Sequence, residues 1–152
     1  MRCTIIILLL VLGLASCSDG DKSTDETGYS IGDTVLAWDT NADSMIMKRD
    51  ITVPDTAITI TRIINGLNGK YPEVHIDFLS QSNDTAYTQV PDADYLGNQM
   101  GSAGALAWFA DAVINITSVP GINYVSFKMD MQSHAASAVI GREKYNDWKK
   151  VR

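Results

Sequence analysis

Four side chains between Asp39 and Asp50 have the spacing of a calcium-binding loop. In the stretch DTNADSMIMKRD they occupy the first, third, fifth and twelfth places: Asp39, Asn41, Asp43 and Asp50. Carboxylate and amide oxygens at these places are the ligand pattern of a twelve-residue calcium loop. Taken alone, the spacing therefore predicts a metal site for Ca²⁺.

The residues around these ligands favour another interpretation, the turn of a hairpin. The sixth place of a calcium loop is normally Gly, which allows a sharp bend, but here it is Ser44. The flanking runs TVLAW and MIMKRDITV are rich in strand-forming residues, and Pro54 soon prevents a helix. Asp, Asn and Ser are also ordinary turn residues. We therefore predict a hairpin over Asp39–Asp50 and no metal, with calcium as the alternative.

Other residues that could support catalysis are sparse. The histidines, His75 and His134, belong to no H-E-x-x-H or G-x-S-x-G motif. The cysteines are Cys3 and Cys17, so the chain beyond them has no thiolate ligand and no disulfide. We predict no enzyme activity, no cofactor and no small-molecule substrate. The net charge of −6 argues against nucleic acid as a partner.

The first 16 residues have the pattern of a secretion signal. Arg2 precedes a continuous apolar run, Ile5 to Leu12, which is too short for a transmembrane helix of about 20 residues. The sequence LASC then places small residues before Cys17, which resembles a bacterial lipobox. In that interpretation residues 1–16 are removed and acyl chains on Cys17 anchor the protein to a membrane. A plain secretory signal with an A-x-A-like cleavage site is the alternative.

Residues 17–32 are polar, acidic and rich in Gly, Ser and Thr. They contain too few apolar side chains to pack, so we expect a disordered tether. Its acidic run either keeps the tether solvated or resembles the surface-exposure signal of some Gram-negative lipoproteins. The expected location is the bacterial cell envelope, as an outer-membrane lipoprotein that is periplasmic or surface-exposed.

The remaining residues, 33–152, are enough for one domain with a modest core. Strand-type residues or alternation occur in the ranges 34–38, 45–49, 73–80, 85–90 and 124–131. Helical spacing occurs over 56–67 and 102–118, and Gly101-Ser102 is the expected N-cap of the second helix. The last 20 residues have no sustained period and are expected to be irregular, with their basic residues in solvent.

The order of these elements, β-β-α-β-β-α-β, predicts the fold class. A small mixed sheet with two helices on one face is the simplest arrangement that buries every apolar face. We therefore predict an α+β two-layer domain.

Two stretches resemble the GerMN domain of sporulation and spore germination proteins. TVLAWDTNADSMIMKRDITVP is similar to the family's opening hairpin: a strand, an acidic turn, a second strand and an Arg. GSAGALAWFADAVINITSVPGINYVSF is similar to its second half, where a Gly-Ser pair opens a helix that ends in Thr, Pro-Gly and a strand. The resemblance spans residues 34–131. It implies an envelope-anchored, non-enzymatic domain that acts through protein contacts.

Aromatic side chains are the best candidates for a protein-binding surface. Trp108 lies off the main apolar face of its predicted helix, and Tyr124 alternates with the apolar residues of its predicted strand. Exposed Trp and Tyr are frequent interface anchors. We expect an envelope protein as the partner. A surface lipoprotein that binds a glycan or a calcium-dependent ligand is the alternative function.

Overall fold

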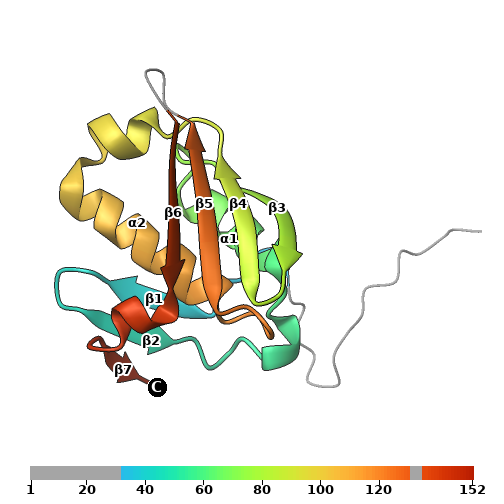
Figure 1. Ribbon diagram of the computed structural model, residues 1–152. Helices are drawn as coiled ribbons and strands as arrows, with labels where there is room; N and C mark the ends of the chain where they lie inside the picture. Colours follow the sequence, from blue (N-terminus) through green and yellow to red (C-terminus); the bar gives the residue numbers. More distant parts are fainter. Residues whose placement is uncertain (1–31, 131–134) are drawn as a thin grey trace, which may run out of the picture. The chain divides into compact units, whose positions relative to one another are not determined.

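The computed structural model describes residues 32–130 and 135–152 (Figure 1). The predicted signal sequence, Cys17 and almost all of the predicted tether lie outside the described residues. The described part is an α+β domain, which confirms the predicted class, but it has two sheets where one was expected. None of its helices is long and apolar enough to cross a membrane.

The smaller sheet has three strands in the order β1-β2-β7. β1 (Trp38–Asn41) and β2 (Ile46–Arg49) form an antiparallel hairpin, and β7 (Lys149–Val151) runs parallel to β2. The hairpin is the one predicted from the sequence. Residues 34–37, expected to belong to its first strand, instead run beside the first helix, where the Val35 N–H donates to the Arg62 carbonyl at 3.0 Å.

The larger sheet has four strands in the order β3-β4-β5-β6. Its strands are β3 (Asp77–Ser82), β4 (Thr85–Val90), β5 (Tyr124–Asp130) and β6 (Ala135–Gly141). β4 and β5 are parallel, and the outer pairs are antiparallel. β6 and β7 lie in the segment expected to be irregular, so that expectation is wrong. The small residues of β6 show no local period, and its pairing with β5 defines it as a strand.

Two helices pack on one face of the larger sheet (Figure 1). A short 3₁₀ turn, η1 (Asp55–Ala57), precedes α1 (Ile60–Lys70), and the Thr59 side chain caps α1. A π-helical turn, η2 (Tyr95–Gln99), leads directly into α2 (Gly101–Ile116). Ser102 therefore does not cap α2, contrary to expectation, because the chain already winds helically before it.

The helix α2 lies at the centre of the domain and contacts α1, β1 of one sheet and β5 of the other. Every residue from Trp108 to Ile116 is buried except Phe109, which is half-buried. A helix that is apolar on all sides is expected in such a place. Two polar residues, Asp111 and Asn115, are buried with it and need partners.

Candidate functional site

The side chains of the calcium pattern lie on the β1–β2 hairpin, and the first two are engaged in separate interactions. Asp39 Oδ1 lies 3.4 Å from Lys70 Nζ, on α1. Asn41 Oδ1 accepts from the Ser44 N–H at 2.9 Å and so shapes the turn. The positive φ of the turn (52°) falls on Met45, the seventh place of the pattern, whereas a calcium loop needs its Gly at the sixth.

Asp50, the twelfth place, has local partners. Its Oδ1 accepts from the hydroxyl and the backbone N–H of Thr52, at 2.7 and 2.9 Å, and these two bonds lower the pKa of Asp50. Among the described residues, no group of three His, Cys, Asp or Glu is placed to hold a metal ion. The acidic stretch therefore acts as the turn and second strand of a hairpin in this structure.

Asp111 on α2 is the most buried carboxylate described, at 1% exposure. Its Oδ1 accepts from Thr40 Oγ1 at 2.6 Å, and its Oδ2 accepts from the Tyr71 hydroxyl at 2.5 Å. Lys70 Nζ lies 2.7 Å from the same Oδ2. The carboxylate therefore links α2 to β1 and to the end of α1.

This cluster changes the proton affinity of two of its members. Burial lowers the pKa of Lys70, but the hydrogen bond and ion pair with Asp111 outweigh burial, so the net shift is upward. Burial, followed by the hydrogen bond to Asp111, raises the pKa of Tyr71 far above its ordinary value. Lys70 is thus held charged and Tyr71 held neutral. The polar atoms of the cluster satisfy one another, which suits a structural link between elements.

Asn115, one turn after Asp111, completes this link. Its Oδ1 accepts from the Trp38 N–H at 2.9 Å, and its Nδ2 donates to the Trp38 carbonyl at 3.0 Å. At Trp38 the amide therefore makes the two backbone hydrogen bonds that a neighbouring strand would make. In the sequence, Asp111 and Asn115 stand out as a carboxylate and an amide inside the otherwise apolar run FADAVINI. Neither residue was among those predicted from the sequence to have a role.

Arg142 corrects the expectation that the basic C-terminal residues are solvated. Its guanidinium donates to the Ile114 carbonyl at 2.8 Å and to Ser118 Oγ at 3.1 Å, at the end of α2. It also lies over the Trp38 ring, 5.0 Å from its centroid. Burial lowers the pKa of Arg142. The residue caps the end of α2 and stacks on the Trp38 ring of β1.

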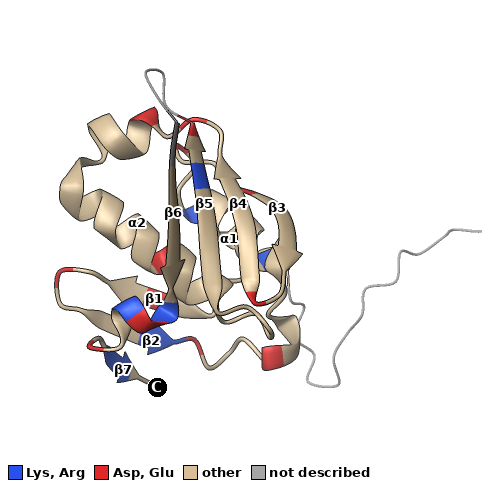
Figure 2. Ribbon diagram, in the orientation of Figure 1, with Lys and Arg blue, Asp and Glu red and all other residues tan. Residues whose placement is uncertain are grey.

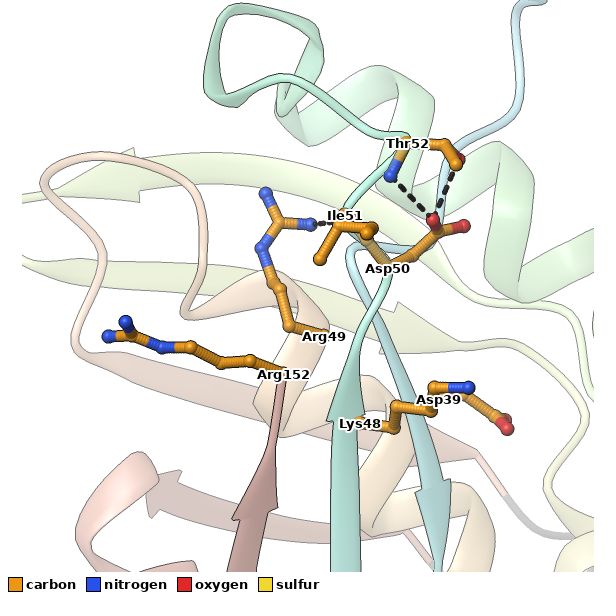
Figure 3. A pocket seen from close by; sticks show the side chains of 7 residues that line it. All are labelled: Asp39, Lys48, Arg49, Asp50, Ile51, Thr52 and Arg152. Atoms are coloured by element: carbon orange, nitrogen blue, oxygen red, sulfur yellow. Dashed lines mark hydrogen bonds between the residues drawn. The ribbon is translucent and has the colours of Figure 1, made fainter.

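A hollow of about 550 Å³ lies beside the smaller sheet (Figure 3). Lys and Arg gather at this end of the domain, on β2, β7 and η3 (Arg142–Tyr145) (Figure 2). In the hollow, Arg49 donates to the Val53 carbonyl and to Asp55 Oδ1, both at 2.9 Å. Arg49 and Asp50 thus have internal partners. The hollow carries charges of both signs: Lys48, Arg49 and Arg152 against Asp39 and Asp50.

Trp108 was expected on an interaction surface, and the structure contradicts this. The side chain is 0% exposed and packs against Phe109 and Phe127, with ring centroids 5.1 and 5.6 Å away. The expectation assumed that α2 has one apolar face, whereas the part of α2 from Trp108 to Ile116 is buried on nearly all sides. Trp108 belongs to the core.

Tyr124 is exposed, as expected, and lies on the face of the larger sheet that the helices leave uncovered. Here that face is called the open face. It carries three exposed apolar or aromatic side chains, Tyr87, Tyr124 and Val139, at 41%, 38% and 66% exposure. Tyr87 and Val139 lie in register on either side of Ser126 of β5. The strands β3 to β6 bear few charged residues in the view of Figure 2.

The packing of β5 fixes the direction of these side chains. Val125, Phe127 and Met129 are buried toward the helices, while Tyr124 and Lys128 point the other way. The tyrosines therefore stand on a sheet anchored from behind by the core.

Comparisons of the chain with protein families, with characterised proteins and with solved structures find no match.

Proposed function

We propose that this chain is a membrane-anchored lipoprotein of the bacterial cell envelope and that its domain binds another envelope protein without catalysing a reaction. The observation that carries the proposal is the open face, with Tyr87, Tyr124 and Val139 exposed on a rigid sheet. Tyrosines held in this way lose little conformational freedom on binding and offer both apolar area and a hydroxyl. The surface suits a protein partner with a flat apolar patch.

The polar interior supports the same proposal. Asp111 binds Thr40, Tyr71 and Lys70, and so connects α2 with β1 and with the end of α1. The lipobox-like sequence before Cys17 and the resemblance to GerMN domains also support an anchored interaction module. Acyl chains on Cys17 would keep the domain at a membrane surface, where it would meet a membrane-bound partner by diffusion within the plane of the membrane.

The test removes the tyrosines and measures capture of a partner. The intact lipoprotein, solubilised from membranes with its interacting proteins, is compared with the double variant Tyr87→Ala/Tyr124→Ala. Each tyrosine is expected to contribute about 1–2 kcal/mol to the binding free energy, so the double variant should recover at least about tenfold less partner. Ile51→Ala is the matched control, because Ile51 is 80% exposed but lies away from the open face.

Equal recovery by the double variant and the control would contradict the open face as the binding surface. Failure of the wild-type protein to recover any specific protein would contradict the proposed function itself. Circular dichroism of both variants confirms that they remain folded.

A further inference from the structure

The two sheets have four edge strands, β1, β7, β3 and β6. An edge strand presents unpaired backbone N–H and C=O groups, which can pair with another chain. Proteins usually protect such edges with charged residues, bulges, very short strands or a covering group. The edges of this domain differ in how they are protected.

Both edges of the smaller sheet are protected. On β1, the amide of Asn115 occupies the backbone N–H and C=O of Trp38. β7 is only three residues long and carries Lys149 and Lys150. A short, cationic strand is a poor template for pairing.

The β3 edge of the larger sheet is interrupted. Its register with β4 shifts between Phe78 and Ser80, which marks an irregularity at Leu79. Such a bulge twists a strand and disrupts the row of backbone groups that a new strand would need.

β6 lacks these protections along most of its length; a charged group, the Glu143 carboxylate, lies beside it only at its last residue, Gly141. It runs for seven residues, AASAVIG, with no charged residue and no proline. Its register with β5 is continuous from Gly141 to Ala135, and within the described part of the chain β5 is its only strand partner. Ser137 and Val139 are exposed on it, and Val139 reaches 66% exposure.

We propose that β6 pairs antiparallel with β6 of a second copy of this chain, so that the two four-stranded sheets join into one. A two-fold axis at Ala138, the middle of the strand, aligns all seven residues. Each Val139 then faces the smaller Ser137 of the second copy. The absence of charge on β6 favours an identical partner, because self-pairing meets no like-charge repulsion.

Such an interface closes after two copies, because both edges are consumed by the same contact. The two open faces also become continuous across the axis, with Val139 of each copy close to the join. The hollow described above lies beside the smaller sheet, and no residue of β6 lines it. β6 therefore offers a partner the unpaired backbone groups of its edge, and an identical strand can pair with them. The inference does not depend on the proposed envelope partner or on the anchor.

The experiment measures the mass of the full chain in detergent solution by sedimentation velocity. We expect a dimer with a dissociation constant of about 10 µM or tighter. Ser137→Lys or Val139→Lys places a lysine at the edge, in the contact, and should weaken the dimer about tenfold or more. Ile51→Lys, at an exposed apolar position outside β6, should leave it unchanged.

The register is tested by rescue. In the double variant Ser137→Lys/Val139→Glu, the introduced lysine of each copy would face the introduced glutamate of the other, so the dimer should return. The double variant Ser137→Lys/Val139→Lys should stay monomeric. A wild-type chain that is monomeric at about 100 µM, roughly ten times the expected constant, overturns the proposal. So does a dimer that both lysine variants leave intact, or a failure of the lysine–glutamate pair to restore it.

Discussion

At the scale of single residues, the domain depends on a buried carboxylate. A buried charge is costly unless it is paired and hydrogen-bonded. Asp111 meets this requirement with Thr40, Tyr71 and Lys70, which come from β1 and from the end of α1. Its loss would leave the Thr40 and Tyr71 hydroxyls without this acceptor, and Lys70 with only the more distant Asp39 carboxylate.

We expect Asp111→Ala to lower the free energy of unfolding by about 2–3 kcal/mol, because the half-buried Thr40 and Tyr71 hydroxyls lose their acceptor and Lys70 loses its closer carboxylate. Asp39→Ala is the matched control: Asp39 contacts the same Lys70, but its side chain is 79% exposed. Removing the Asp39 carboxylate should lower the free energy of unfolding by less than about 0.5 kcal/mol. Urea denaturation followed by tryptophan fluorescence measures both. Similar costs for the two variants would contradict the assigned role of Asp111.

The same cluster predicts a loss of stability in alkali. The pKa values of Lys70 and Tyr71 are raised on folding from ordinary values of 10.5 and 10.0. Burial likewise raises the pKa of Tyr145 to about 12. A raised folded-state pKa gives stability that is complete below the unfolded pKa and is lost above it. The free energy of unfolding should therefore be constant with respect to these groups at neutral pH and fall above about pH 10.

The tyrosine part of this fall is separable. Tyr71→Phe removes the ionising group, so its stability should fall less steeply above about pH 10 than that of the wild-type protein. Tyr124→Phe, at an exposed position, should keep the wild-type slope. Denaturant unfolding at a series of pH values measures the slopes. If Tyr71→Phe kept the slope of the wild-type protein, Tyr71 would not contribute to the loss of stability in alkali.

At the scale of elements, α1 packs closely against the chain before β1. A Cβ built on Gly66 would lie 2.5 Å from the Val35 carbonyl oxygen, whereas one on Gly69 would meet nothing within 4 Å. Both glycines lie within α1. The helix therefore needs Gly66 for close approach, while Gly69 provides no such contact.

Two alanine variants test this difference. Gly69→Ala should stabilise the protein by about 0.5–1 kcal/mol, because alanine favours the helix. Gly66→Ala has the same helical gain but forces the backbone at Val35 to move, so a net loss of about 1–3 kcal/mol is expected. Thermal unfolding gives the sign of both changes. Stabilisation by both variants would contradict the close packing of α1 on Val35.

At the scale of the whole molecule, the proposed anchor would decide where the domain works. In the lipobox interpretation, Cys17→Ser blocks acylation, so the protein should leave the membrane fraction or accumulate uncleaved, and palmitate labelling should be lost. Cys3→Ser is the matched control, because Cys3 lies in the segment expected to be removed and its loss should change neither result. Unchanged labelling in Cys17→Ser would contradict the anchor.

The match between sequence and structure depends on the range of the interactions. The β1–β2 hairpin and the strand β5 were predictable, because their residue types and alternation are local signals. β6 was not, because AASAVIG has no period and gains its backbone partners from β5. The start of α2 was predicted to within one residue, but its N-cap was not, because η2 extends the helical winding before Ser102.

The residues of the candidate site were likewise predictable only where the signal in the sequence is local. Tyr124 was predictable as an exposed residue from its place in an alternating strand, whereas Tyr87 and Val139 join it only when β4, β5 and β6 pair. Trp108 was misjudged because sequence spacing gives the faces of α2 but not how many of them are covered. Asp111 and Asn115 gain their roles from groups on α1 and β1.

The sequence by itself determined the α+β class, the hairpin at the acidic stretch and the expectation of an anchored envelope protein, because these depend on residue types at short spacing. Only the tertiary structure decided that the chain builds two sheets, that α2 is buried between them, and that the described residues leave the open face and the β6 edge uncovered. Long-range packing and strand pairing bring residues far apart in the sequence together, and no local pattern records which pairs form.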